Sequence, residues 1–286
     1  NSFYMSYKMK LVILNKDKVC KFHCIMKNMK SLVNEVNMSI SNGGIYIQGM
    51  DSAHVGLFEL KLERAWFDGY ENNQDITLGL SCEALSTIMN CHNDGQSITL
   101  TYKENKPLTI EFKGKGHDKK FELKLMDIET ELMGIPETDY DADITMKSSE
   151  FNKLMAENSL FADTLTVKLG EDDNIYMSAS GDIGKIEVKI KEDDIEEYAL
   201  SEDVKMSHAY PLKYCLLYSK FTKINKNVSL HLMDNTPLKI MYDLSHWIDE
   251  DCDPCVVNDD DESYKNNYLG FYLAPKLDEE EFFEDD

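Results

Sequence analysis

This sequence of 286 residues contains only one arginine, Arg64, and no apolar run of about 18 residues. No transmembrane helix is therefore expected. Residues 1–10 show no charged region followed by an apolar stretch, so no signal peptide is expected there. The patterns G-x-x-x-x-G-K-[ST], G-x-G-x-x-G, H-E-x-x-H and G-x-S-x-G are missing as well. The histidines are isolated, and neither catalysis nor a cofactor is predicted.

Cysteines are few, and their number is odd. The seven thiols lie mostly in apolar runs, which is typical of a reduced, intracellular protein. Cys252 and Cys255 form a lone C-x-x-C pair. A structural zinc site usually needs a second pair of ligands, and none is evident. Two unpaired loop thiols are therefore favoured over a metal site or a disulfide.

The net charge of −23 argues at first against nucleic acid as a partner. However, residues 249–262 hold eight acidic side chains and residues 278–286 hold seven, with no Lys or Arg in either run. The rest of the chain has 38 acidic and 30 basic residues. This distribution leaves room for a locally basic surface.

The clearest internal pattern is a repeat. Residues 98–110 align with residues 228–240 without a gap, at an offset of 130. Both copies predict a β-hairpin, with an Asn-x-Pro turn between two alternating strands. A helical stretch precedes each copy, over 82–91 and over 212–223.

The earlier part of each half follows the same order. A helix over 19–36 precedes a strand over 44–48, and a helix over 149–161 precedes strands over 164–169 and 174–179. Each half therefore predicts an α+β unit with helices on one face of a mainly antiparallel sheet. Residues 126–140 show neither the two-residue alternation of a strand nor the 3.6-residue period of a helix. They also carry Gly134 and Pro136, which indicates an extended linker.

One face of the first predicted helix is apolar, and the opposite stripe holds polar side chains: His23, Lys27, Lys30 and Asn34. Lys213, Lys220 and Lys223 lie on a comparable face of the last predicted helix. An ordinary solvated helix surface explains both stripes. A basic lining for a phosphate backbone explains them as well, without reading base sequence.

Apolar residues also occur in predicted loops, at 50–57, at 132–135 and at 273–276. They either pin the linker onto the sheets or line a surface groove.

Five short segments resemble signatures of the proliferating cell nuclear antigen family of DNA sliding clamps, in the family's order and near its spacing. They are Met50-Asp-Ser-Ala-His54-Val, Lys124-Leu-Met-Asp127, Gly134-Ile-Pro-Glu137, Ser178-Ala-Ser-Gly181 and Leu273-Ala-Pro-Lys276. The resemblance covers about residues 11–277. It implies two clamp domains per chain, with antiparallel sheets outside and helices lining the pore of a homotrimeric ring.

The resemblance also implies partners and sites. Duplex DNA passes through the pore, a clamp loader ATPase opens the ring, and DNA polymerases and other proteins dock through short peptides. Residues implied to face DNA are His23, Lys27, Lys30, Lys153, Lys213, Lys220 and Lys223. Residues implied to bind partner peptides are Met50, His54, Leu57, Leu132, Met133, Ile135, Pro237, Tyr272, Ala274 and Pro275. The implied domain boundaries are 1–10 for an N-terminal extension, 11–125 and 142–277 for the clamp domains, 126–141 for the connecting loop, 249–267 for an acidic insertion and 278–286 for an acidic tail.

The chain departs from the family where the second helix begins. Residues 71–74 replace a basic motif, and Thr87 and Asn90 stand where the family has lysines, so this helix should carry no positive charge. Two alternatives stay open: a subunit of a mixed checkpoint-type ring, and a viral polymerase accessory protein that forms no closed ring. A eukaryotic clamp would act in the nucleus, and one from a large DNA virus could act in a cytoplasmic replication factory.

Overall fold

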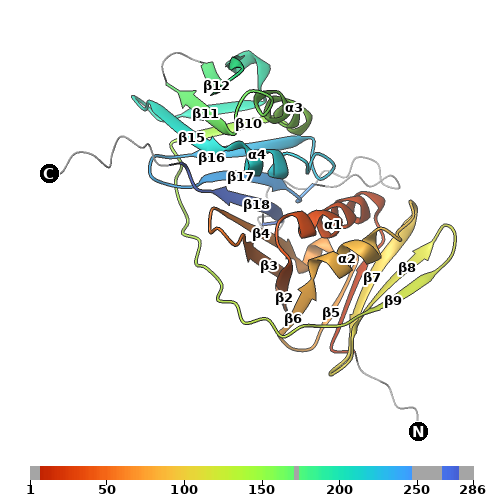
Figure 1. The fold of residues 1–286 in the computed structure, drawn as a ribbon. Coiled ribbons are helices and arrows are strands. Elements are labelled where there is room, and N and C mark those ends of the chain that lie inside the picture. Colours follow the sequence, from red (N-terminus) through yellow and green to blue (C-terminus); the bar gives the residue numbers. More distant parts are fainter. Residues whose placement is uncertain (1–6, 171–173, 247–265, 277–286) are drawn as a thin grey trace, which may run out of the picture. The chain divides into compact units, whose positions relative to one another are not determined.

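The computed structural model describes residues 7–170, 174–246 and 266–276, and the chain divides into two compact units (Figure 1). Each unit has antiparallel sheets and two α-helices, which confirms the predicted α+β class. Unit 1 comprises Asn1–Ser52, Phe58–Met133 and Asp243–Leu269, and unit 2 comprises Ala53–Leu57, Gly134–Tyr242 and Gly270–Asp286.

Unit 1 builds its sheets from the first half of the chain. One sheet has the order β5-β1-β7-β8-β9, and the other contains the run β4-β3-β2-β6. In the second run, β2 pairs antiparallel with β3 and with β6. The strands are β1 (Met9–Ile13), β2 (Glu35–Ser41), β3 (Gly44–Met50), β4 (Gly56–Glu63), β5 (Gly69–Asn72), β6 (Ile76–Ser81), β7 (Gln96–Tyr102), β8 (Leu108–Gly114) and β9 (Lys119–Leu123).

Unit 2 repeats this plan with the second half of the chain. It has a sheet of order β13-β12-β11-β15 and the run β14-β10-β16-β17-β18. The strands are β10 (Ala142–Lys147), β11 (Thr164–Leu169), β12 (Asn174–Gly181), β13 (Gly184–Lys191), β14 (Glu197–Leu200), β15 (Met206–Pro211), β16 (Asn227–Leu232), β17 (Leu238–Asp243) and β18 (Tyr268–Leu273).

The helices are α1 (Lys16–Asn28), α2 (Cys82–Met89), α3 (Ser148–Asn158) and α4 (Leu212–Tyr218). Asn15 caps α1, because its side chain accepts from the backbone N–H groups of Asp17 at 3.0 Å and Lys18 at 3.1 Å. In each unit the two helices pack against each other, as Figure 1 shows. Short 3₁₀ turns occupy Met29–Ser31, Arg64–Trp66 and Glu192–Asp194.

The helix predicted over 82–91 ends two residues early, at Met89, and the other three predicted helices extend too far by three residues or more. The helix predicted over 19–36 ends at Asn28, and β2 already begins at Glu35. Val36 fits the helical spacing, but Val36, Met38 and Ile40 also follow the two-residue alternation of a strand. All three lie on β2 with their side chains buried. The other two helices end at Asn158 and Tyr218, before the predicted ends at 161 and 223. Apolar side chains continue beyond both ends at helical spacing: Leu160 and Phe161 after α3, and the buried Phe221 and Ile224 after α4.

Both copies of the repeat form the predicted hairpins. Strands β7 and β8 pair across one turn, and β16 and β17 pair across the other. Asn105 and Asn235, at equivalent positions of the two turns, have φ values of 56° and 60°. Asparagine is enriched in this left-handed region, so the repeated Asn answers a repeated backbone requirement.

Candidate functional site

The basic residues predicted on the first helix divide into exposed and engaged side chains. Lys30 is exposed in the 3₁₀ turn after α1, and Lys27 is half-buried in the last turn of α1. His23 lies one turn before Lys27, with its Nε2 2.9 Å from the carbonyl oxygen of Met89. Its ring lies 5.1 Å from that of His92. His23 therefore packs against the end of α2, whereas Lys30 is open to a phosphate.

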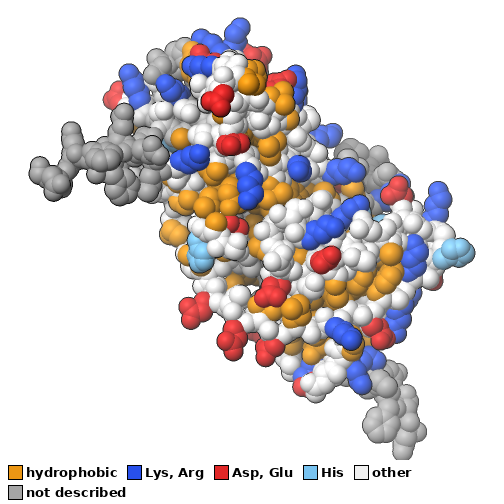
Figure 2. Space-filling view, in the orientation of Figure 1, with side chains coloured by type: hydrophobic (Ala, Val, Ile, Leu, Met, Phe, Trp, Pro, Cys, Tyr) orange, Lys and Arg blue, Asp and Glu red, His pale blue; other side chains and the backbone are white. Residues whose placement is uncertain are grey.

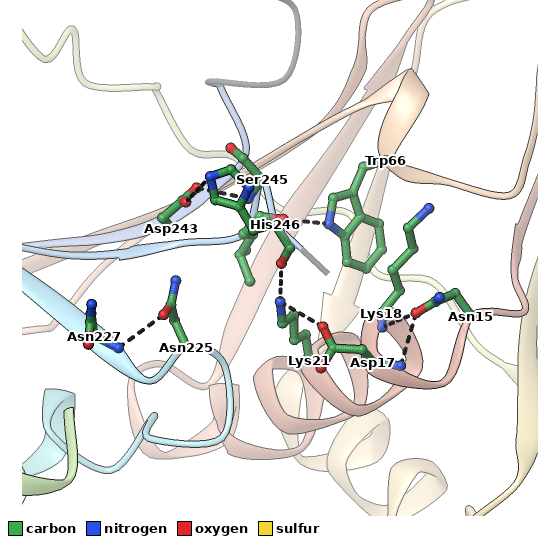
Figure 3. A network of polar contacts seen from close by, with 11 residues as sticks. Asn15, Asp17, Lys18, Lys21, Trp66, Asn225, Asn227, Asp243, Ser245 and His246 are labelled. Carbon is green, nitrogen blue, oxygen red and sulfur yellow. Dashed lines mark hydrogen bonds and ion pairs between the residues drawn. The ribbon is translucent and has the colours of Figure 1, made fainter. Parts of the chain in front are cut away.

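Two further lysines of α1 have a structural role instead. The side chains of Lys18 and Lys21 are only 5% and 7% exposed. Lys18 pairs with Asp68 at 3.3 Å. Lys21 pairs with Asp17 at 2.8 Å and donates to the carbonyl oxygen of His246 (Figure 3). These ammonium groups are already neutralised, so they are poor candidates for binding DNA.

Unit 2 presents its predicted lysines at the surface. Lys153 is exposed on α3, 4.0 Å from Glu157, and Lys213 is exposed on α4. Lys220 and Lys223 are exposed too, but they follow α4 and do not belong to it, because the helix ends at Tyr218. Figure 2 shows basic side chains on the surface of unit 2, with acidic side chains among them.

Helix α2 carries no basic residue, as expected from its sequence. It begins at a cap formed by Ser81, whose hydroxyl accepts from the N–H of Ala84 at 3.3 Å, and its first turn holds Glu83. The hydroxyl of Thr87, where the family has a lysine, donates back to the carbonyl of Glu83 at 2.9 Å. Of the two α-helices of unit 1, only α1 carries lysines.

Three of the predicted peptide-binding residues belong to unit 1. Met50 is half-buried at the end of β3. Leu132 and Met133 lie in the connecting loop of residues 126–141, at the end of the part that belongs to unit 1. Their side chains are 58% and 53% exposed. Exposed large apolar side chains in a row mark a surface that another molecule can cover.

Unit 2 holds the other seven. The N–H of Ala274 donates to the carbonyl of Val55 at 3.0 Å, which brings the segment with His54 and Leu57 beside the segment with Tyr272 and Pro275. His54 is exposed with φ at 57°, whereas Leu57 is only 8% exposed and serves the core. Ile135 and Tyr272 are half-buried and Pro237 is exposed.

Sequence reasoning missed the polar contacts that hold the connecting loop of residues 126–141 on unit 1. The N–H of Met126 donates to the carbonyl of Gly79 on β6 at 2.9 Å. Asn37 of β2 donates to the carbonyl of Ile128 at 3.0 Å and to the hydroxyl of Thr130 at 2.9 Å. One of these contacts is a backbone bond and the other two come from the single side-chain amide of Asn37, so no motif marks them.

Two family models match the chain. The model described as the N-terminal domain of proliferating cell nuclear antigen matches residues 12–132, and the one described as its C-terminal domain matches residues 134–252. Together they cover well over half of the sequence. The chain belongs to the proliferating cell nuclear antigen family. It is thus a PCNA-like member of the sliding clamps of DNA replication, which are non-enzymatic scaffolds.

Two of the described thiols, Cys82 and Cys215, are buried. Burial raises the pKa of Cys82 and that of Cys215 to about 12. Both thiols are therefore protonated at neutral pH and unsuited to act as nucleophiles. Cys252 and Cys255, the predicted unpaired pair, lie outside the described residues.

No helix within the described ranges is long and apolar enough to cross a membrane.

Proposed function

We propose that this clamp-family protein forms a closed homotrimer that encircles duplex DNA and tethers DNA polymerase and other replication proteins through short peptides. The main support is that both family domains occur in one chain, each with lysines exposed on or just after a helix. A ring of three such chains would present six matching units to a phosphate backbone. Contacts made by lysine alone would bind DNA without reading its sequence.

Two sheet edges that are unpaired within the described part of the chain support the ring. Strand β9 ends the order β5-β1-β7-β8-β9, and β13 ends the order β13-β12-β11-β15. An edge strand leaves backbone N–H and C=O groups unpaired, and proteins usually cover such edges. We propose that β9 of one subunit pairs with β13 of its neighbour, within residues 119–125 and 184–190.

Exposed apolar side chains near β13 also support the ring. Leu160 is 70% exposed and Ile183 is 75% exposed. Their segments touch, because a Cβ placed on Gly181 would come 2.1 Å from the carbonyl oxygen of Phe161. Two large apolar side chains beside a free strand edge form a suitable surface for a neighbouring subunit.

Light scattering coupled to size-exclusion chromatography tests the ring. A mass of three chains at micromolar concentration is expected, and Ile183→Lys should shift the distribution toward monomer because it puts a charge into the subunit contact. A wild-type monomer would refute the homotrimer, leaving a mixed ring or a polymerase accessory protein without a ring. A loader ATPase would be needed to place the closed trimer on circular DNA, and retention on circular but not on linear DNA would show encirclement.

A further inference from the structure

Gln48, on β3 of unit 1, holds the connecting segment where its exposed apolar residues begin. Its Nε2 donates to the carbonyl oxygen of Met133 at 2.9 Å, and its Oε1 accepts from the N–H of Met133 at 2.8 Å. One side-chain amide thus satisfies both backbone groups of a residue that lies in neither a helix nor a strand. Beyond this point the neighbourhood is open, because a Cβ placed on Gly134 would meet nothing within 4 Å.

The amide of Gln48 is itself held in one orientation. Its Nε2 also donates to the hydroxyl of Tyr46 at 3.0 Å, and that hydroxyl donates to Oε2 of Glu59 at 2.8 Å. A phenol has one proton, and here Glu59 accepts it. The oxygen of Tyr46 can therefore only accept from Gln48. If the amide turned over, oxygen would face oxygen at Tyr46, and both bonds to Met133 would be lost.

Glu59 is a fixed end to this chain of hydrogen bonds. It lies on β4, is only 4% exposed, and its Oε1 accepts from the hydroxyl of Tyr268 at 2.8 Å. A buried carboxylate is costly unless it accepts such bonds, so Glu59 strongly favours both tyrosine protons pointing at it. Burial, with Glu59 beside them, raises the pKa of Tyr46 and that of Tyr268, so both phenols keep their protons at neutral pH.

We propose that Gln48 is a positioning residue for partner binding. It would fix the backbone at Met133 so that the side chains of Leu132 and Met133 stay exposed to the apolar anchors of a docking peptide. Tyr46 and Glu59 would set the orientation of its amide. The proposal rests on the proposed function for its ligand, but the hold on Met133 can be measured without any ligand.

The test compares Gln48→Ala with Gln74→Ala, which removes the same amide from an exposed loop of unit 1. Hydrogen exchange at the N–H of Met133 is measured first, in the free protein. It should be at least about tenfold faster in Gln48→Ala, which corresponds to a 1.4 kcal/mol change in protection, and unchanged in Gln74→Ala. Tyr46→Phe should give a smaller acceleration, because the amide of Gln48 can then turn over.

The second measurement is the Kd of a peptide of the form Q-x-x-aliphatic-x-x-aromatic-aromatic. It should rise severalfold in Gln48→Ala, while thermal unfolding shows that the variant is folded. Wild-type exchange at Met133 in Gln48→Ala would overturn the hold, and wild-type exchange in Tyr46→Phe would overturn the role of Tyr46. Faster exchange with an unchanged Kd would overturn the positioning role. A wild-type protein that binds no such peptide would instead refute the proposed function, and the exchange rates would still decide the hold.

Discussion

Removing three lysines should weaken the attraction for DNA without unfolding the protein. Lys27, Lys30 and Lys223 lie on or just after the helices, and Lys30 and Lys223 are exposed. Changing all three to Ala removes up to three phosphate contacts per subunit. Each contact with duplex DNA contributes about 0.9 to the slope of log affinity against log salt. The slope should therefore fall by up to about 2.7 for every subunit that touches DNA.

The assay is the salt dependence of DNA binding between about 50 and 200 mM, where such contacts have a large effect. Stimulation of a polymerase on primed circular DNA should fall in parallel, while light scattering shows an unchanged oligomer. A matched control changes Lys106, Lys115 and Lys205 to Ala, which removes the same charge from exposed turns. If both triple variants lower the slope equally, only the overall charge matters, and the assignment of the helix lysines to DNA is wrong.

Four other outcomes are expected. Ile135→Asp should raise the Kd of a clamp-binding peptide at least about tenfold, because a charge would face its apolar anchors; an unchanged Kd would remove Ile135 from the site. Trp66→Phe should lower the free energy of unfolding by about 2–4 kcal/mol, because Trp66 is fully buried and its Nε1 donates to the carbonyl of Leu244 at 3.0 Å; urea unfolding measures this, and a loss below about 0.5 kcal/mol would contradict it. Burial lowers the pKa of His231 despite its bond to an aspartate, so stability should fall as pH drops below about 6.5, because the unfolded chain then takes up a proton that the folded chain resists; the fall should be smaller in His231→Gln. Deleting residues 249–265 should leave peptide binding intact and change DNA loading at low salt. If the deletion variant loads as well as the wild-type protein at every salt concentration, the acidic segment is inert.

The sequence predicted best where two independent patterns agreed. The two hairpins follow from alternating strands, and the repeat placed an Asn in the same turn position twice. Strand β11 has the predicted bounds of Thr164–Leu169, because a clear alternation stands between polar breaks. Helix ends were predicted less well, since Val36 satisfies both a helical and an alternating spacing.

Side-chain partners explain the rest of the difference. Lysines of one predicted helix look alike in sequence, yet Lys21 is buried in an ion pair on α1 whereas Lys30 is exposed in the turn after it. Besides the local ion pair with Asp17, Lys21 donates to the carbonyl oxygen of His246, 225 residues later in the chain, and sequence spacing does not encode that contact. The hold of Gln48 on Met133 is also a long-range pairing, which spacing within either segment does not encode.

The base of the acidic insertion offers a practical graft point. The N–H of Leu244 donates to the carbonyl of Asn267 at 2.8 Å, and the Oδ1 of Asn267 accepts from the N–H of Glu63 at 2.7 Å. Both ends of the intervening stretch are thus fastened inside unit 1, whatever lies between them. Because these bonds hold the two ends side by side, a fluorophore tag or an affinity handle inserted between them keeps its two attachment points together in unit 1, and would give a label for following the protein on DNA.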